Sequence, residues 1–310
     1  MTKKSDGLPS GTKIDDYRLI KILGGGGFSI VYLGRHRRSG KQFVIKEYMP
    51  GSMCKRNPDG SVSALSEDVA SRMNRGRKLF FQEASTLAKL KHQNIVNVVN
   101  FFRANGTVYM VMEYQGGQNL QQYLKQRKGG LSETFLNVVF MRLLDGLELI
   151  HNNDLLHLDI KPSNIHIRPG GQPILLDFGA VHGFPQSRQL QPGQVISPGY
   201  SPIEQYDNKG YVGPWTDLYA LGATMRSCID GKPGQPADER QTEDKQKPLV
   251  SQYKKRYSKT MLQAIDWATE MDPMLRPQSV AEFRTVLTQK ETEKANTPFE
   301  RLANTLLGKD

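Results

Sequence analysis

A short polar segment in the middle of the chain carries three side chains with complementary chemistry. Residues 157–164 read His-Leu-Asp-Ile-Lys-Pro-Ser-Asn and lie between apolar segments. Asp159 can accept a proton from a hydroxyl group, Lys161 can neutralise a transferring phosphoryl group, and Asn164 can offer an oxygen to a hard cation such as Mg²⁺. A polar loop that holds one residue of each type by chance is an equal alternative. The flanking sequence must therefore decide between the two interpretations.

A second acidic side chain follows at the end of another strand-like segment. Residues 165–167 and 174–176 flank Pro-Gly-Gly, which predicts a tight hairpin whose second strand ends at Asp177. This hairpin would place Asp177 opposite Asn164. Two oxygen donors at the ends of adjacent strands form a divalent-cation site, which a single aspartate would not. The sequence therefore predicts that Asn164 and Asp177 hold Mg²⁺ together.

A run of glycines near the N-terminus connects two strand-like segments. Residues 17–23 lead into Gly-Gly-Gly-Gly-Phe-Ser at 24–29, and residues 30–33 leave it, which predicts a strand, a glycine turn and a strand. Glycines let the backbone approach a ligand closely and point N–H groups at phosphate oxygens. A flexible hairpin tip is the alternative, and the choice depends on a lysine arriving from the next strand.

That lysine is Lys46, the last residue of an apolar strand over 42–46. A lysine in a buried strand is costly unless it meets an anion or a carboxylate. Residues 78–90 show helical periodicity and carry Glu83 at the edge of the apolar face. We expect Glu83 to pair with Lys46, and a surface pair between Glu83 and a lysine of its own helix is the alternative.

The segment between this strand and this helix is an insert. The Asn-Pro-Asp-Gly turn at 57–60 predicts a small hairpin, and residues 66–76 predict a short helix that begins at Ser66, separate from the helix over 78–90. The insert, at about 51–76, is either a regulatory or partner-binding surface or a decoration of the fold. The sequence favours neither.

The rest of the chain divides into a sheet-rich part and a helical part. Residues 94–102 and 108–114 are strand-like and are joined by a turn at Asn-Gly, whereas the chain becomes mainly helical after about residue 115. Ser132 is expected to cap a long helix that reaches Ile150. Its apolar face is predicted to contain Phe135, Val138, Val139, Leu143, Leu147 and Ile150.

Charge alone does not select a partner for this chain. A formal net charge of +11 over 310 residues fits nucleic acid, acidic lipid, nucleotide phosphates or acidic proteins. The densest basic stretch, residues 72–78, has no stacking aromatic before Phe80, which favours a solvated helix face over a nucleic-acid site. We therefore do not expect nucleic acid as a partner.

The hydropathy pattern predicts a cytoplasmic protein without a membrane span. No apolar run approaches the roughly 20 residues that cross a bilayer, and the polar N-terminus lacks the apolar core of a signal peptide. Cys54 and Cys228 match no metal-ligand or redox spacing, so we assign them no chemistry.

Taken together, these motifs resemble the Ser/Thr branch of the protein-kinase superfamily over about residues 17–287. The phrases at 46–50 and 202–206 look like the eukaryote-type kinases of bacteria. The resemblance implies an α+β fold with two lobes, a small antiparallel β-sheet lobe with one main helix and a larger, mostly helical lobe. The implied parts are a flexible lead-in at 1–16, an N-lobe at 17–114 with the insert, a C-lobe at 115–289 and a tail at 290–310.

The resemblance also implies residue roles and the cofactors ATP and Mg²⁺. Asp159 and Lys161 take the catalytic positions, and Asn164 and Asp177 the metal positions. The Glu113 carbonyl and the Gln115 N–H would pair with adenine, and Ser29 stands where a third glycine usually sits. The implied ATP-binding residues are Leu23, Gly24, Gly25, Gly26, Gly27, Phe28, Ser29, Val31, Val44, Lys46, Glu83, Glu113 and Gln115.

The implied reaction is transfer of the ATP γ-phosphoryl group to Ser or Thr hydroxyls of a protein substrate. Ser-Pro-Ile-Glu at 201–204 stands where the activation segment of a kinase closes, and its Glu204 is expected to pair with Arg276. An ATP-binding pseudokinase scaffold and a kinase-like small-molecule phosphotransferase are the alternatives. The intact Lys46, Asp159, Asn164 and Asp177 argue against the scaffold.

Leu158 and His166 also depart from the family pattern. Leu158 stands where many kinases have the arginine that reads a phosphate on the activation loop, a task that an apolar side chain cannot perform. We therefore hypothesise that activity does not require activation-loop phosphorylation, which alanine substitutions at Ser187 and Ser197 would test. His166 replaces the apolar residue expected beneath adenine, where it either stacks on the base or packs within the fold.

Overall fold

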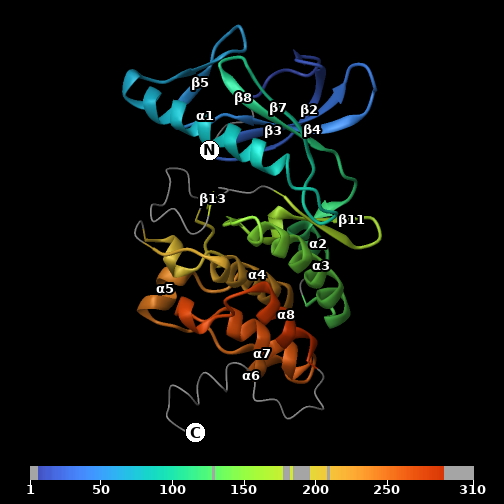
Figure 1. Ribbon diagram of the computed structural model, residues 1–310, viewed down its shortest axis with the longest axis vertical. Helices are drawn as coiled ribbons and strands as arrows, with labels where there is room; N and C mark the ends of the chain where they lie inside the picture. Colours follow the sequence, from blue (N-terminus) through green and yellow to red (C-terminus); the bar gives the residue numbers. More distant parts are fainter. Residues whose placement is uncertain (1–5, 128–129, 177–181, 184–195, 208–209, 290–310) are drawn as a thin grey trace. The chain divides into compact units, whose positions relative to one another are not determined.

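The structure is a computed structural model that describes residues 6–127, 130–176, 182–183, 196–207 and 210–289. The chain forms two compact units, Met1–Gly116 and Gly117–Asp310. The first unit is built around a β-sheet and the second around helices (Figure 1).

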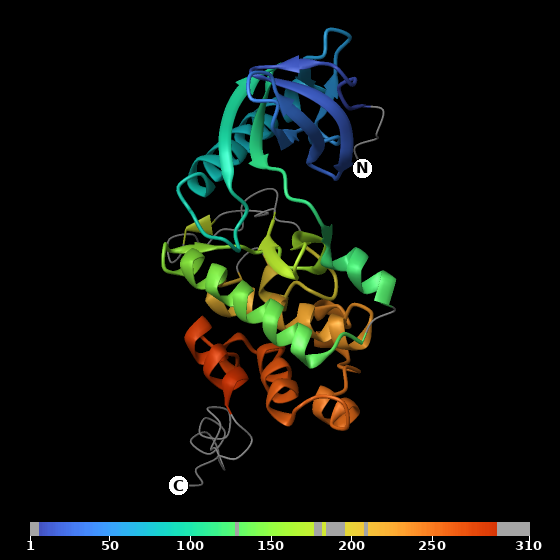
Figure 2. The same cartoon turned by 90° about the vertical axis from the view of Figure 1, so that its right-hand side faces the viewer.

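A six-stranded antiparallel sheet forms the centre of the first unit. Its strand order is β1-β2-β3-β4-β8-β7, and its twist is visible in Figure 2. The strand that was expected from residue 94 begins at Val98, and the buried Ile95 and Val96 lie in the segment before it. The strands are β1 (Lys13–Ile14), β2 (Tyr17–Gly25), β3 (Ser29–His36), β4 (Gln42–Tyr48), β7 (Val98–Ala104) and β8 (Thr107–Glu113).

One continuous helix, α1 (Glu67–Leu87), replaces the two helices expected on either side of residue 77. Its buried side chains Met73, Phe80, Ala84 and Leu87 form one stripe that passes through Gly76 without interruption. A Cβ atom at Gly76 would lie 1.9 Å from the Tyr48 hydroxyl oxygen. The glycine therefore serves close packing of the helix on β4 and does not break the helix.

The insert contains the predicted hairpin. Strands β5 (Cys54–Arg56) and β6 (Val62–Ala64) pair antiparallel, with Cys54 opposite Ala64. Gly60 adopts a φ of 84° in the turn, which is the left-handed region that favours glycine. The hairpin lies beside α1 (Figure 1).

The second unit is organised by two long helices. In α3 (Glu133–His151), the Ser132 hydroxyl accepts a 3.2 Å hydrogen bond from the Phe135 N–H, which confirms the predicted cap. Phe135 and Val138 were expected in the core, but Phe135 stacks on Tyr123 and Val138 is 43% exposed. The residues that bury this face are Leu136, Val139, Phe140, Leu143, Leu144, Leu147 and Ile150.

The helix α4 (Pro214–Asp230) is buried along almost its whole length, which makes it the axis of the second unit. Among the described residues, no helix is both long and apolar enough to cross a membrane. The other helices of this unit are α2 (Leu120–Arg127), α5 (Ala237–Thr242), α6 (Leu249–Tyr253), α7 (Lys259–Ala268) and α8 (Val280–Thr288).

Short strands frame the polar segment from which the chemistry was predicted. The expected hairpin is formed by β11 (Ile165–Arg168) and β12 (Gln172–Leu175), and β9 (Gln118–Asn119) adds a third strand. On the other side, β10 (Leu155–Leu156) pairs with β13 (His182–Gly183). A single turn of 3-10 helix, Pro162–Asn164, connects the polar segment to β11.

Candidate active site

The structure brings Asp159, Lys161 and Asn164 into one hydrogen-bonded cluster. The Asp159 Oδ1 atom accepts a 2.7 Å bond from Lys161 Nζ, and the Oδ2 atom accepts a 2.7 Å bond from Asn164 Nδ2. Asn164 Nδ2 also donates to the Asp159 carbonyl at 2.9 Å. The Asp159 carboxylate, 9% exposed, is thereby held in a single orientation.

Ser197 is a member of this cluster that the sequence analysis did not identify. Its hydroxyl donates to Asp159 Oδ1 at 2.8 Å and accepts from Lys161 Nζ at 2.8 Å. The residue is 7% exposed, and its N–H donates to the Ser201 hydroxyl at 3.0 Å. Ser197 was named only as a candidate for phosphorylation, whereas its hydroxyl is a buried contact of Asp159. A Ser187→Ala, Ser197→Ala double variant would confound phosphorylation with damage to the site.

The backbone before Asp159 is anchored by Asp217 of α4. The Asp217 carboxylate accepts the N–H groups of His157 and Leu158, each at 2.8 Å, and lies 2.9 Å from His151 Nε2. Burial by itself raises the pKa of Asp217, but the hydrogen bond and electrostatic attraction of His151 bring this pKa below its ordinary value. A side chain of the central helix thus holds the backbone directly before Asp159.

Leu158 has a buried side chain and an unusual backbone. Its φ is 59°, in the left-handed region, and its side chain packs with Leu156 and Val212. The Leu158 carbonyl accepts a 2.9 Å hydrogen bond from Gln205 Nε2. Leu158 therefore joins the polar segment to Val212 through its side chain and to Gln205 through its carbonyl group.

The predicted pair between Glu204 and Arg276 is confirmed. Arg276 Nη1 lies 2.7 Å from Glu204 Oε1, and Nη2 lies 3.1 Å from Oε2. The Thr216 hydroxyl also donates to Glu204 Oε1 at 2.9 Å, and the guanidinium lies 4.6 Å from the centre of the Tyr219 ring. Both charged side chains are buried. Buried charges of opposite sign are stable where they are paired and hydrogen-bonded, as these two side chains are.

The donor set around Asn164 fits a hard divalent cation. The Asn164 amide oxygen is an oxygen ligand of the kind that Mg²⁺ prefers. The Leu176 N–H donates to the Asn164 carbonyl at 2.8 Å. The other predicted metal residue, Asp177, lies outside the described residues. Within the described residues, no group of three or more His, Cys, Asp or Glu side chains could hold a metal, here or at any other place.

The glycine run lies in the first unit, where Gly24 and Gly25 end β2 and Gly26 and Gly27 begin the turn to β3. Gly26 N–H donates to the Ser29 carbonyl at 2.9 Å, and Leu23 and Phe28 are 44% and 40% exposed. A Cβ atom added at Gly24, Gly26 or Gly27 would meet no atom within 4 Å. Packing within the chain therefore does not explain these glycines, and their contact with phosphate stays a prediction.

Lys46, Val31 and Val44 lie on the neighbouring strands β3 and β4. Lys46 is opposite Val31 in the sheet, and its Nζ atom lies 5.8 Å from the centre of the Phe80 ring on α1. Glu83 is three residues further along the same helix and is partly buried. Its pairing with Lys46 stays a prediction.

The residues predicted to meet adenine lie at the end of the sheet. Glu113 is the exposed last residue of β8 and donates its N–H to the Asn97 carbonyl at 3.1 Å, and Gln115 follows in the connecting segment. In the second unit, His166 lies on β11, and its Nε2 atom would be 3.0 Å from a Cβ atom added at Gly117. The His166 ring therefore lies close to Gly117, which favours the packing interpretation of His166.

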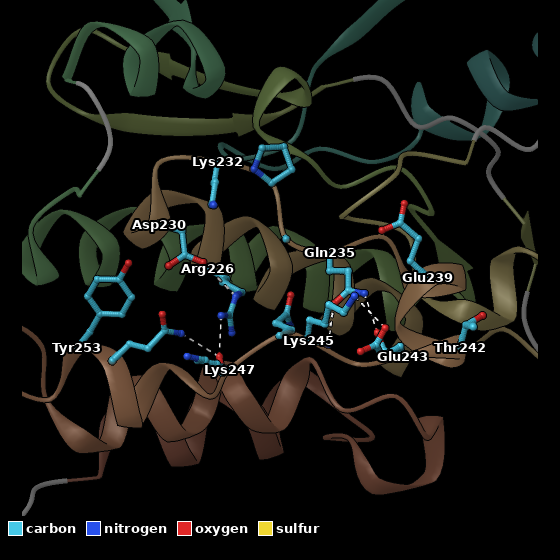
Figure 3. A pocket seen from close by; sticks show the side chains of 14 residues that line it. Arg226, Asp230, Lys232, Gln235, Glu239, Thr242, Glu243, Lys245, Lys247 and Tyr253 are labelled. Atoms are coloured by element: carbon cyan, nitrogen blue, oxygen red, sulfur yellow. Dashed lines mark hydrogen bonds and ion pairs between the residues drawn. The ribbon is translucent and has the colours of Figure 1, made fainter.

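A pocket of about 1000 Å³ in the second unit contains none of the predicted site residues (Figure 3). Arg226 lies in it with its Nε atom 3.1 Å from Asp230 Oδ2, and its Nη2 atom donates to the Lys247 carbonyl at 2.8 Å. Four basic and three acidic side chains line the pocket, so its charges largely cancel. The charged lining residues are Arg226, Lys232, Lys245, Lys247, Asp230, Glu239 and Glu243.

Comparison with known proteins gives a consistent assignment. The protein kinase domain model matches residues 17–290. The chain is 33% identical over 272 residues to the serine/threonine-protein kinase PknA of Nostoc, covering 84% of this chain and 44% of the relative. It is 31% identical over 303 residues to the serine/threonine-protein kinase C of Synechocystis, covering 94% of this chain and 52% of the relative.

A solved structure, described as PpkA-294 apo form, is 34% identical, with a TM-score of 0.81, and the match covers 91% of this chain and 100% of that one. The two curated kinases named above are longer proteins, and the chain spans about half of their length. These findings confirm the two-part α+β fold and the predicted resemblance. The chain belongs to the protein kinase family, with Ser/Thr kinases of bacteria among its relatives.

Proposed function

We propose that this chain is an ATP-dependent protein serine/threonine kinase. The observation that carries the proposal is the cluster in which Lys161, Asn164 and Ser197 all donate to the Asp159 carboxylate. A scaffold that only binds ATP does not need an acid, a cation and an amide in contact with one another. Membership of the family supports the same activity.

The proposed base is Asp159. An ionised carboxylate offers about four lone-pair positions. Two donors occupy Oδ1 and one occupies Oδ2, so a position on Oδ2 remains for a substrate hydroxyl. Asp159 would orient that hydroxyl and accept its proton, and Lys161 would neutralise charge on the transferring phosphoryl group.

The proposed nucleotide site uses the glycine run and Lys46 for the phosphates of ATP. Glycine N–H groups and the Lys46 ammonium are suited to phosphate oxygens, and Glu83 would position that ammonium. Asn164 and Asp177 would hold Mg²⁺, which neutralises phosphate charge when it is bound. Leu23, Val31 and Val44 would provide apolar contact, and the Glu113 carbonyl and the Gln115 N–H would pair with adenine.

We further infer that activity does not require activation-loop phosphorylation. The contacts that anchor Leu158 involve the Asp217 carboxylate, the Gln205 amide and two apolar side chains. None of these groups would need a phosphate to act. A protein rather than a small molecule is the proposed substrate, because the buried Glu204–Arg276 pair holds a segment that kinases use to meet protein substrates.

The test is incubation of the protein with labelled ATP, Mg²⁺ and generic protein substrates, together with an Asp159→Ala variant. We expect label on Ser or Thr with the wild type. The variant should lose transfer by at least about 10²-fold while it keeps its affinity for ATP. Equal turnover by wild type and variant would refute Asp159 as the base. Label that appears on small molecules and not on protein would refute the proposal that the substrate is a protein.

A further inference from the structure

We propose that the insert hairpin β5–β6 is a positioning element for the phosphate-binding groups of the first unit, and that it acts through the pair formed by Glu47 and Arg56. The inference rests on the proposed function and adds to it a role for the insert. It depends only on contacts within the first unit.

The Glu47 carboxylate has no exposed surface and accepts four hydrogen bonds. The hydroxyl groups of Tyr32 and Tyr109 donate to its two oxygens at 2.6 and 2.5 Å. Arg56 donates to the same two oxygens at 2.5 and 3.0 Å. A buried charge is tolerated when it is paired and fully hydrogen-bonded, and Arg56, the residue of the hairpin, supplies the opposite charge.

Arg56 also fastens the rest of the insert to this pair. Its guanidinium donates to the Gly60 carbonyl in the hairpin turn at 3.0 Å and to the Asp6 carbonyl at 2.6 Å. The Leu8 N–H donates to the Tyr32 hydroxyl at 3.1 Å, which brings the N-terminal segment onto the same network. One guanidinium therefore joins the hairpin, the N-terminal segment and the sheet.

The position of Glu47 in β4 links this network to Lys46. Successive side chains of a strand point to opposite faces, so Lys46 and Tyr48 face away from Glu47. Both contact the Phe80 ring of α1, with Lys46 Nζ at 5.8 Å and the Tyr48 ring at 5.7 Å from its centre. Anchoring Glu47 on one face of the sheet therefore sets the register and direction of Lys46 on the other.

A second connection runs from the hairpin to the glycine run. The N–H groups of Met49 and Gly51 donate to the carbonyls of Phe28 and Gly27 at 2.9 and 3.3 Å. Cys54, the first residue of β5, donates its N–H and its thiol to the Pro50 carbonyl at 3.1 and 3.2 Å. The turn that holds the tip of the glycine run is thus bonded directly to the start of the hairpin.

The first test compares Arg56→Met and Arg56→Lys with Leu19→Ala, which removes a buried side chain of the same unit outside this network. Hydrogen exchange of residues 24–29 reports the order of the glycine run, and MgADP titration reports nucleotide affinity. We expect Arg56→Met to speed exchange there and to weaken MgADP binding by roughly tenfold. Arg56→Lys should recover part of both effects. Leu19→Ala should lower thermal stability without either effect.

A second pair of variants keeps the inference testable if Arg56→Met fails to fold. Gly51→Pro removes the N–H that meets the Gly27 carbonyl, whereas Gly51→Ala keeps it. We expect faster exchange at 24–29 and weaker MgADP binding only with proline. Normal exchange and affinity in both Arg56→Met and Gly51→Pro would overturn the inference while the proposed function stands. A wild type that neither binds MgADP nor transfers phosphate would overturn both.

Discussion

The buried carboxylate of Asp217 accepts a 2.8 Å hydrogen bond from the backbone N–H of Leu158, whose φ of 59° is left-handed. A leucine in this conformation costs on the order of 1–3 kcal/mol and persists only where its surroundings compensate. Because Leu158 directly precedes Asp159, this bond sets the direction of the chain at the proposed base. The positioning of that base therefore depends on a residue of the central helix α4.

We expect Asp217→Asn to lower both activity and stability. An amide offers one acceptor oxygen in place of two and turns an NH₂ group toward the N–H donor of either His157 or Leu158, because these two donors bond to different carboxylate oxygens. The loss of a charged acceptor should reduce the free energy of unfolding by about 2–3 kcal/mol and kcat by at least about tenfold. Urea unfolding and steady-state kinetics would measure both. An exposed acid of α1, in Asp68→Asn, is the control and should change neither.

The same carboxylate predicts a pH dependence of stability. The pKa of Asp217 is lowered in the folded chain, so its contribution is present above the unfolded pKa of about 3.9 and is lost as pH falls through the folded value. The free energy of unfolding should therefore fall more steeply below about pH 4 in the wild type than in Asp217→Asn. Urea unfolding across acidic and neutral pH measures the difference, and identical pH profiles would contradict the assignment.

Ser197→Ala and Ser187→Ala should behave differently. The Ser197 hydroxyl bonds to both Asp159 and Lys161, so its removal takes one hydrogen bond from each and weakens their positioning, which should lower kcat about tenfold or more. Ser187→Ala should retain activity if activation-loop phosphorylation is not required. Kinetics on protein freed of phosphate by a phosphatase, checked by mass spectrometry, make the comparison. Collapse of Ser187→Ala to background would remove support for independence from phosphorylation.

Arg276→Met should destabilise the second unit strongly. It leaves the Glu204 carboxylate buried without its cation, and breaking a buried pair in this way costs about 3–5 kcal/mol. Lys245→Met breaks an ion pair with Glu243 in which both side chains are about 70% exposed, and such a pair contributes roughly 0–1 kcal/mol. Chemical unfolding of both variants measures the contrast. Similar losses would show that burial of the Glu204 pair does not matter.

Gly76→Ala should destabilise the first unit, although alanine is the better helix former by about 1 kcal/mol. The added Cβ atom would lie 1.9 Å from the Tyr48 hydroxyl oxygen and would force α1 away from β4. Tyr48→Phe removes the nearest atom, so the double variant should recover part of the loss. A double-mutant cycle from thermal unfolding measures this coupling. Stabilisation by Gly76→Ala alone would show that the helix does not need the close contact.

The Glu204–Arg276 pair, 72 residues apart, was implied by the family resemblance, whereas the features predicted correctly from the residues themselves have signals that are local in the chain. The cap at Ser132 depends on an N–H three residues away, and the hairpin of β11 and β12 depends on the turn between them. The continuity of α1 through Gly76 was not predicted, and the predicted core face of α3 was wrong at Phe135 and Val138. In both cases the outcome depends on what packs against the helix, which periodicity within the helix does not specify.

Residue types and their order were sufficient to identify a kinase fold, a glycine run, a lysine at a strand end and the polar segment 157–164. Tertiary structure alone decided how that segment is held. Ser197 and Asp217, which contact it, lie 38 residues beyond Asp159 and 59 residues beyond Leu158 in the chain. A hydrogen bond requires atoms within about 3 Å, and over such separations only packing brings them together. Arg56 reaches Glu47 for the same reason.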